Sequence, residues 1–334
     1  MGYNATRTDV EYLFMTTVAA GGSSLSTFSS TVQELFCCPM CHGPLNARQG
    51  TLVCAACDAA YPTTDSGQLD LRLRAPKTIS IDFTIGGQDV VPQAHARIDL
   101  LRPNPSPQIP EYPSIPIPSL LRHGNRLTRT LLSYFPRPAG GGVMLDLGCG
   151  YEDFKPLCAH TGLEYVGIDY DGPAKILADG HALPFKDNSF DFVMSFAVLE
   201  HLRYPFVALR EVRRVLKPGA PFIGTVAFLE SFHLNSFYHP SPLGTYDLLA
   251  GSGFEIIGIE PNANWQCLRA QGWMGLFPHA PQVLSDLLIL PLHLLHRAWW
   301  KLGGLVDPRA ATSERTRLIT NTAGFRFVCR KPAG

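Results

Sequence analysis

Apolar runs and amphipathic segments alternate along the second half of the chain. The apolar runs are short and nearly continuous, as expected for strands that are covered on both faces. They lie at residues 143–147, 164–169, 189–195, 220–228, 253–260 and 324–330, and the chain that leads into 179–185 supplies one more. Residues 205–215 instead place their apolar side chains along one face of a helix. The alternation predicts an α/β fold with a doubly wound, mostly parallel sheet of seven strands.

Two segments of the first third lack this alternation. Residues 1–33 are rich in Ser, Thr, Gly and Ala, which predicts a flexible tail. Residues 76–118 hold seven prolines between Pro103 and Pro118, which predicts an extended, semi-rigid linker. The linker either separates two bodies or wraps over the second one. We therefore expect a small domain at 34–75 and a large one at 119–334 that opens with an amphipathic helix at 120–135.

An insertion at about 265–315 interrupts the large domain. Its residues 283–300 are apolar and helical in pattern, and Pro291 is expected to break the helix. Asp286 and Arg297 make the stretch too polar to span a bilayer. It is either a buried or dimer-forming helical hairpin, or a lid at a membrane interface for a hydrophobic acceptor.

Four cysteines form two closely spaced pairs near the amino terminus. Cys38 and Cys41 are followed twelve residues later by Cys54 and Cys57. Two such pairs can aim four thiolates at one point, which is the usual arrangement of a structural zinc site, and iron would fit the same ligands. Disulfides or buried thiols are the alternative interpretation. A site with four protein ligands leaves no position open for catalysis.

A glycine turn follows the apolar run at 143–147. Gly148 and Gly150 allow a tight turn close to a ligand, and Asp146 places a carboxylate beside it. Asp169 ends the next run, 21 residues after Gly148, where an acidic residue suits the hydroxyls of a ribose. The pattern predicts a nucleotide-like ligand at the carboxyl ends of these strands.

Composition narrows the class of protein. The 334 residues are 46% hydrophobic and carry 28 basic and 28 acidic side chains, so a large nucleic-acid footprint is not expected. The amino terminus lacks the pattern of a secretory signal. We expect a cytoplasmic protein, in which paired cysteines bind metal.

The cysteine region resembles the zinc-ribbon family of small activator subunits of tRNA and protein methyltransferases. The resemblance rests on residues 38–45, 52–57 and the pair Tyr61-Pro62, about forty residues in all. In that family the ribbon is an accessory part and not the catalyst.

Residues from about 120 to 262, with a return near 318–330, resemble class I S-adenosylmethionine-dependent methyltransferases. The motifs that carry the resemblance lie at 145–150, 166–169, 179–185, 188–191, 198–202 and 210–219. The resemblance implies that the glycine turn holds the methionine part of the cofactor, Asp169 the ribose and Asp179 the adenine. The cofactor-binding residues that it implies are Asp146, Gly148, Cys149, Gly150, Asp169, Tyr170, Asp179, Gly180, Ser195 and Phe196.

Two departures from that family's pattern concern the cofactor loop. Glu152 stands where many relatives have a third glycine, which puts the contacts of the loop in doubt. Only nine residues separate Asp169 from Asp179, too few for a full crossover helix. We expect a tight loop there and a wider cleft.

Methyl transfer from a sulfonium mainly requires alignment of donor and acceptor, so no base is obligatory. His201 follows a strand end and is either a base or a packing histidine. His233, Tyr238 and His239 lie in the loop after the next strand and line the acceptor pocket or form a surface lid. We take all four as candidate catalytic residues.

The sequence favours a small-molecule, lipid or glycan intermediate as methyl acceptor, with contact to a membrane surface or a homodimer as further expectations. An RNA or ribosome methyltransferase that docks through the ribbon is one alternative. A cofactor-binding scaffold protein without catalysis is another.

Overall fold

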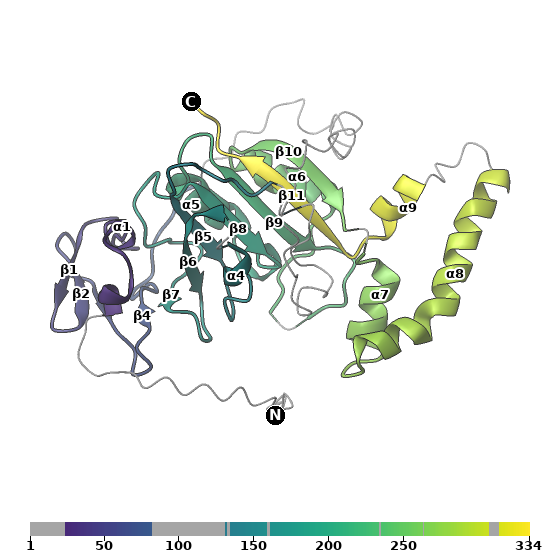
Figure 1. The fold of residues 1–334 in the computed structure, drawn as a ribbon, viewed down its shortest axis with the longest axis horizontal. Coiled ribbons are helices and arrows are strands. Elements are labelled where there is room, and N and C mark those ends of the chain that lie inside the picture. Colours follow the sequence, from purple (N-terminus) through teal and green to yellow (C-terminus); the bar gives the residue numbers. More distant parts are fainter. Residues whose placement is uncertain are drawn as a thin grey trace.

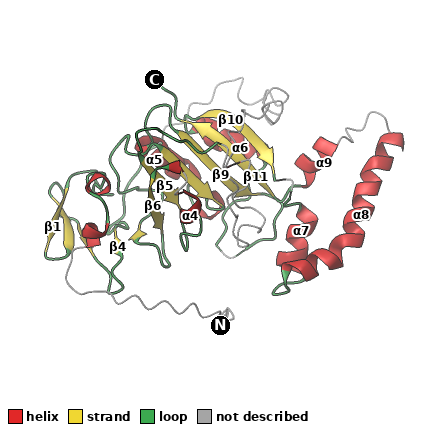
Figure 2. Ribbon diagram, in the orientation of Figure 1, coloured by secondary structure: helices red, strands yellow, loops and turns green. Residues whose placement is uncertain are grey.

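The computed structural model describes residues 24–81, 131, 134–158, 161–233, 235–262, 264–306 and 314–334. Its centre is an eight-stranded sheet in the order β10-β11-β9-β8-β5-β6-β7-β4 (Figures 1 and 2). The strands are β4 (Leu69–Asp70), β5 (Val143–Leu147), β6 (Glu164–Asp169), β7 (Ile176–Leu177), β8 (Phe192–Phe196), β9 (Pro221–Ala227), β10 (Glu255–Pro261) and β11 (Gly324–Arg330). All pair in parallel except β11, which is antiparallel to both of its neighbours. The expected seven strands are present, and β4 adds an eighth at one edge.

The sheet separates two apolar cores because successive side chains of a strand point to opposite faces. Leu145 of β5 packs in one core and its neighbour Met144 in the other. The first core is covered by α5 (Pro205–Val215) and α6 (Pro242–Gly251), and the second includes Phe154 and Cys158 around the short α4 (Lys155–Cys158). Every residue of β5 is buried, Asp146 included, as expected for a strand that is covered on both faces.

The connection between β6 and β7 contains no helix. Residues 170–175 form a bent loop in which Gly172 has a φ of +79°, a conformation that favours glycine. Gln68 donates hydrogen bonds from Nε2 to the carbonyls of Gly172 and Ala174, at 2.8 and 2.7 Å. The expected tight loop is therefore present, and a residue outside the large domain holds it.

The cysteine region is a three-stranded antiparallel ribbon. Its strands are β1 (Leu45–Arg48), β2 (Thr51–Cys54) and β3 (Ala60–Pro62). The expectation of a flexible tail through residue 33 is wrong for its last ten residues, which include η1 (Ser24–Thr27) and α1 (Ser30–Gln33). Ser29 caps α1 by accepting a hydrogen bond from the Val32 amide, and Val32 is fully buried.

The ribbon packs directly on the large domain. Val32, Phe36, Leu52 and Tyr61 belong to the same apolar core as β5 and α5. Backbone hydrogen bonds join residues 35–37 to residues 184–186, and the rings of Phe36 and Phe185 lie 5.3 Å apart. The small domain is thus not a separate body, although the proline-rich segment that follows it lies outside the described residues.

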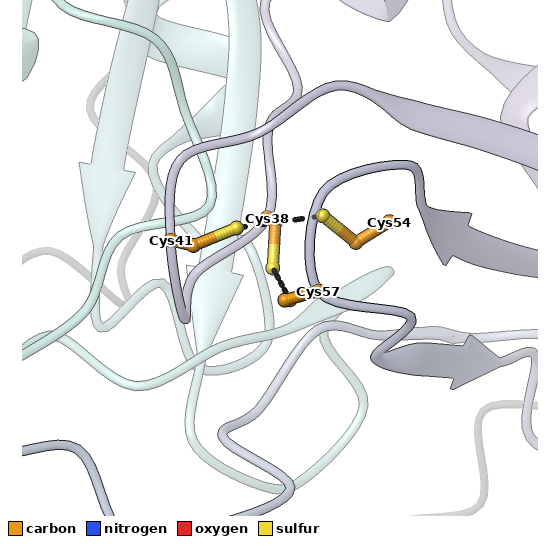
Figure 3. Close-up of side chains that lie close together, drawn as sticks. All are labelled: Cys38, Cys41, Cys54 and Cys57. Atoms are coloured by element: carbon orange, nitrogen blue, oxygen red, sulfur yellow. Dashed lines mark hydrogen bonds between the residues drawn. The ribbon is translucent and has the colours of Figure 1, made fainter.

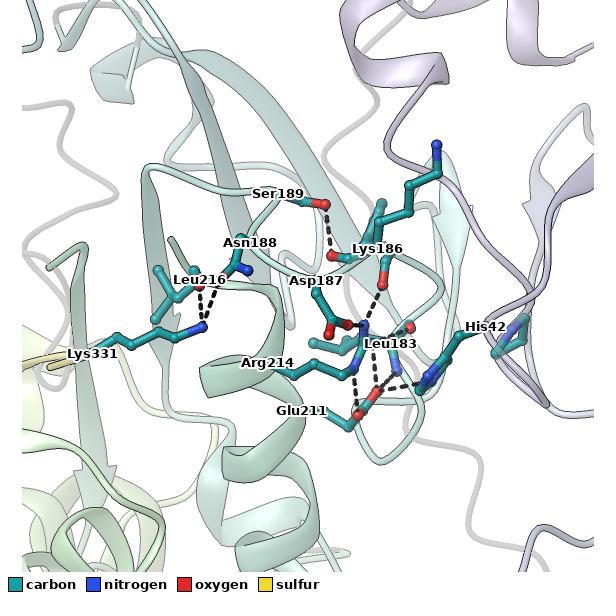
Figure 4. Close-up of polar contacts among 12 residues, drawn as sticks. His42, Leu183, Lys186, Asp187, Asn188, Ser189, Glu211, Arg214, Leu216 and Lys331 are labelled. Carbon is teal, nitrogen blue, oxygen red and sulfur yellow. Dashed lines mark hydrogen bonds and ion pairs between the residues drawn. The ribbon is translucent and has the colours of Figure 1, made fainter. Parts of the chain in front are cut away.

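Arg214 organises the polar rim of this contact (Figure 4). Its guanidinium donates to both carboxylate oxygens of Glu211, to Asp187 and to two backbone carbonyls. His42 of the ribbon lies 4.0 Å from the same Glu211 carboxylate. The bidentate pair between Arg214 and Glu211 is directional, so it holds these two partly buried side chains in one arrangement.

The insertion forms a helical unit at the opposite end of the molecule from the ribbon (Figure 1). It comprises α7 (Cys267–Gln271), a π-helical turn η5 (Gly272–Leu276), α8 (Gln282–Val306) and α9 (Glu314–Asn321). The expected break at Pro291 is wrong, because α8 continues through it. The carbonyl that loses its donor belongs to Leu287, which is exposed, so water can take the hydrogen bond.

No helix in the described part of the chain is both long enough and apolar enough to cross a bilayer. The expected helix at 120–135 lies mostly outside the described residues. Of it, Leu131 and Phe135 are described, and both are buried in the second core.

Candidate active site and metal centre

A cavity of about 990 Å³ opens at the carboxyl ends of β5, β6 and β8. This edge is where open α/β sheets bind their ligands, beside the point at which the strand order reverses. The residues that line it include Gly148, Asp169, Asp179, Ala197, His201 and Tyr204. Its size is at the upper end of the range for ligand pockets, which is about 300–1,000 Å³.

The first glycine of the turn, Gly148, leaves no room for a side chain. Gly148 has a φ of +75°, and a Cβ built on it would lie 2.3 Å from Cγ2 of Val198. Its amide and that of Cys149 both donate to the carbonyl of Ile168 in the neighbouring strand. Gly148 is therefore required both by the backbone conformation and by the close approach of Val198.

The Asp169 carboxylate is hydrogen-bonded to the backbone of the glycine turn. Its carboxylate accepts hydrogen bonds from the Gly150 and Tyr170 amides, at 2.8 and 2.7 Å, one on each oxygen. A carboxylate can accept about four hydrogen bonds. The remaining lone pairs of Asp169 face a cavity that it lines, where they suit the two hydroxyls of a ribose.

Asp179 has a second partner that the sequence did not indicate. The His181 ring donates from Nδ1 to the Asp179 carboxylate at 2.7 Å, and the His181 amide donates to the same oxygen. Burial raises the pKa of Asp179, but these bonds outweigh it and lower the pKa below its ordinary value. Asp179 and Gly180 both line the cavity, as predicted.

Glu152 does not crowd the cavity. It adopts a φ of +56°, the conformation of a glycine, and its carboxylate pairs with Lys155 at 2.6 Å. It is not among the residues that line the cavity. The loop thus keeps the shape that a third glycine would give, with the strain of a left-handed side-chain residue.

Five predicted cofactor residues do not line the cavity: Asp146, Cys149, Gly150, Ser195 and Phe196. Cys149 and Gly150 shape the turn through their backbones. Ser195 and Phe196 are buried in β8, and the Ser195 hydroxyl has no hydrogen-bond partner among the described residues. The strand end that does reach the cavity is Ala197, the next residue.

Asp146 is fully buried rather than presented to a ligand. The Tyr165 hydroxyl donates to its carboxylate, and this approach needs Gly167, where a Cβ would lie 3.0 Å from the Tyr165 oxygen. Burial raises the pKa of Asp146 to about 7, although the Tyr165 hydrogen bond partly offsets the effect. Its role in this structure is to support the turn from beneath.

The candidate catalytic residues lie close together, but not all in one cavity. His201 lines the main cavity, whereas Tyr238 and His239 line a neighbouring pocket of about 520 Å³. His233 lies between the two other histidines, with ring centroids 5.0 Å from His201 and 5.4 Å from His239. His201 belongs to η4 (Leu199–His201), so the loop after β9 folds back onto the end of β8.

Sequence reasoning missed several residues that line the main cavity. Leu73, Lys77, Ile79 and Ile81 follow the ribbon, and Tyr204 and Phe237 come from two loops of the large domain. Residues 73–81 had been assigned to the ribbon end and linker, and nothing in their pattern indicated a ligand. Ile81 and Tyr204 also line the neighbouring pocket, so the two hollows share an apolar wall.

The four cysteines of the ribbon converge as their spacing predicts (Figure 3). Their sulfurs all lie within 4.8 Å of one another, with Cys38 to Cys57 at 3.6 Å and Cys41 to Cys54 at 3.5 Å. A tetrahedral zinc with Zn–S bonds of about 2.3 Å needs sulfurs about 3.8 Å apart. All nine cysteines of the chain are free of disulfides. The ligand set therefore fits one structural zinc.

The other nearby candidate ligands are not in the cluster. Cys37 is buried directly before Cys38 in the chain, and burial raises the pKa of its thiol to about 12. His42 turns toward Glu211 instead. Gly43 allows the two cysteine pairs to approach each other, because a Cβ on Gly43 would lie 2.8 Å from the Cβ of Ala56.

Family models match both parts of the chain. Residues 145–224 match the model described as a methyltransferase domain, and residues 31–66 match the model of Trm112p-like proteins. The chain is thus similar to a methyltransferase domain over residues 145–224 and to Trm112p-like proteins over residues 31–66. Such a domain takes its methyl group from S-adenosylmethionine, and the turn, Asp169 and the cavity described above fit that cofactor.

Curated relatives match the methyltransferase region. An uncharacterised methyltransferase of Mycobacterium leprae is 35% identical over 102 residues, 26% of this chain and 38% of its own length. An uncharacterised protein of Methanocaldococcus jannaschii is 33% identical over 125 residues, 35% of this chain and 55% of its own length. The matches span about a third to about half of these relatives.

Solved structures with similar folds are more distant in sequence. A phosphoethanolamine N-methyltransferase 2 of Haemonchus contortus with S-adenosylmethionine is 19% identical, covers 60% of this chain and 51% of its own, and has a TM-score of 0.40. A complex that contains the Trm112 methyltransferase activator of Haloferax volcanii is 17% identical, covers 60% of this chain and 87% of its own, and has a TM-score of 0.38.

Proposed function

We propose that the protein transfers a methyl group from S-adenosylmethionine to a small-molecule, lipid or glycan intermediate that has an apolar part. The observation that carries the proposal is the mixed lining of the main cavity. Two carboxylates, Asp169 and Asp179, share the lining with the apolar side chains of Ile79, Ile81 and Phe237. The hydroxyls and ring of a nucleoside suit the carboxylates, and an apolar acceptor suits the apolar side chains.

The chain's own residues then bind and align. Asp169 holds the ribose, Asp179 and Gly180 border the adenine, and the turn at Gly148 lets the cofactor lie against the backbone. The bound cofactor supplies an electrophilic methyl group on a sulfonium. Because alignment of donor and acceptor accounts for most of the rate of such a transfer, we assign no general base.

The ribbon serves this site structurally. It lies on the face that includes α5, and the chain that leaves it supplies Leu73, Lys77, Ile79 and Ile81 to the cavity. Four thiolates on zinc also require a reducing compartment, which supports the cytoplasm as the proposed location.

The exposed apolar side chains of helix α8 are a further argument for a hydrophobic acceptor or a membrane surface. It extends away from the sheet (Figure 1) and exposes Leu287, Leu288, Leu294, Leu295, Trp299, Leu302 and Leu305. Exposed apolar surface of this extent marks an interaction site. Aromatic and basic residues such as Trp299 and Lys301 favour a lipid interface over a second copy of the chain.

A direct test uses cofactor labelled at the methyl group. The full-length protein is incubated with a cell extract separated into lipid, small-molecule, protein and RNA fractions, with Asp169→Ala as the control in which weaker cofactor binding should reduce the label. Label in the lipid or small-molecule fraction supports the proposal. Label in RNA or protein would contradict it and favour docking through the ribbon, and no label despite cofactor binding would favour a scaffold.

A further inference from the structure

We propose that Glu200, His201 and His233 form a second metal site, distinct from the ribbon and specific for a divalent first-row transition ion. One ligand atom from each residue lies within 4.8 Å of the others. His201 and His233 are thirty-two positions apart in the chain, on η4 and on the loop after β9. This proposal does not depend on which methyl acceptor the protein uses.

The carboxylate of Glu200 is the strongest single observation. Glu200 is 0% exposed, and neither of its oxygens accepts a well-formed hydrogen bond from any described residue. The backbone amides of Glu200 itself and of Ala227 approach the carboxylate without forming such a bond. A buried carboxylate without partners is costly, and buried charges are usually paired or bound to a metal.

The histidines are oriented as metal ligands are. Nδ1 of His233 lies 3.1 Å from the Ser231 carbonyl, so it carries the proton and leaves Nε2 as the atom available to a metal. His239 repeats this arrangement, with Nδ1 at 3.2 Å from the Phe228 carbonyl and a buried Nε2 without a partner among the described residues. A backbone carbonyl on the far nitrogen is the usual outer partner of a ligating histidine.

His201 completes the set at the cavity wall. Its Nδ1 is buried and has no hydrogen-bond partner in the described part of the chain, while its ring meets that of His233 edge to face. A backbone hydrogen bond holds the loop after β9 against η4, because the Phe237 amide donates to the Glu200 carbonyl at 2.7 Å. His239 is not part of this cluster, although its ring centroid lies 5.4 Å from that of His233. The two imidazoles favour zinc, iron or related ions over calcium or magnesium, for which carboxylates alone would suffice.

The experiment counts metal in the full-length protein. Wild type, His233→Ala and Glu200→Gln are loaded with excess Zn²⁺, desalted and analysed for zinc per chain. His279→Ala is the matched control, because His279 is exposed and lies outside the cluster. We expect two zinc ions in wild type and in the control, and one in each of the two variants.

Cobalt separates the second site from the ribbon. Co²⁺ bound by thiolates gives intense charge-transfer absorption, whereas nitrogen and oxygen ligands do not. We expect a second equivalent of Co²⁺ to bind wild type without adding to that absorption, and His233→Ala to lack it while keeping the thiolate signal. One metal per chain in wild type, or two in His233→Ala, would overturn the proposal, and so would a loss in His279→Ala.

Discussion

Asp169 shows how one side chain can serve both the loop and its ligand. It fixes the Gly150 and Tyr170 amides and still presents lone pairs to the cavity. Asp146, only two positions before Gly148, instead supports the turn from the buried side. The two carboxylates therefore predict different consequences when each is replaced.

Replacing Asp169 should weaken binding of the cofactor. We expect Asp169→Ala to cost about 1–3 kcal/mol of binding free energy, since buried hydrogen bonds to the ribose are lost. Isothermal titration with S-adenosylmethionine measures it, and Asp65→Ala, an exposed aspartate of the ribbon, is the control. Equal affinity of Asp169→Ala and wild type would remove Asp169 from the cofactor site.

Replacing Asp146 should change how stability depends on pH. The pKa of the folded carboxyl is about 7, above its ordinary value near 4, so the folded state binds a proton more tightly than the unfolded state. The stability from this group is fully present below pH 4 and is lost as the pH rises through 7. Asp146→Asn cannot titrate.

The measurement is the free energy of unfolding of both proteins across that range. Relative to Asp146→Asn, wild type should lose up to about 1.4 kcal/mol per pH unit between pH 4 and 7. Subtracting the variant cancels the titration of all other groups. Two curves that run parallel would show that Asp146 stays ionised in the fold.

At the level of elements, α5 joins the ribbon to the sheet. Its inner face packs in the first core, and its last turn places Arg214 against residues 183–187. Those residues in turn pair with residues 35–37 of the ribbon. A substitution of Arg214 should therefore destabilise both the ribbon and the large domain at their contact.

Arg214→Ala should destabilise the protein by about 3–5 kcal/mol, because it leaves the partly buried Glu211 carboxylate without its cationic partner, with only the Leu183 amide among the described residues still donating to it. Chemical denaturation measures the loss. The neighbouring Arg213 is exposed and donates to a single carbonyl, so Arg213→Ala is the matched control and should cost much less. Similar losses in both variants would mean that the Arg214 network does not stabilise the fold.

At the level of the whole molecule, the ribbon and α8 occupy opposite ends of the sheet (Figure 1). The contact between the ribbon and the large domain is buried and rimmed by polar bonds, whereas α8 presents leucines to solvent. The two ends therefore have different tasks. The ribbon stabilises the domain, and α8 is available to a surface outside it.

Charges on α8 should abolish binding to lipid. The double variant Leu288→Glu/Leu295→Glu changes two exposed positions, so folding should be kept. We expect wild type to sediment with anionic phospholipid vesicles and the double variant to remain in the supernatant. Leu276→Glu, exposed in η5, is the control. A wild-type dimer that the double variant splits, without any binding to vesicles, would make α8 a contact between copies.

The sequence by itself determined the parts that depend on local spacing. The two cysteine pairs closed on one point, the alternation of runs predicted the mostly parallel α/β sheet, and the gap between Asp169 and Asp179 excluded a helix. Glycines at 148 and 150 marked the turn because few other residues adopt its backbone. Each of these signals lies within a few residues of the feature that it describes.

Only the tertiary structure decided which distant side chains meet. Asp146 turns to Tyr165 because β5 and β6 pair in one register and Gly167 leaves room. Residues 69–81 join the sheet and line the cavity because the ribbon packs on the domain. Glu200 and His233 meet because a loop folds back. Such contacts depend on packing between elements, which local spacing does not encode.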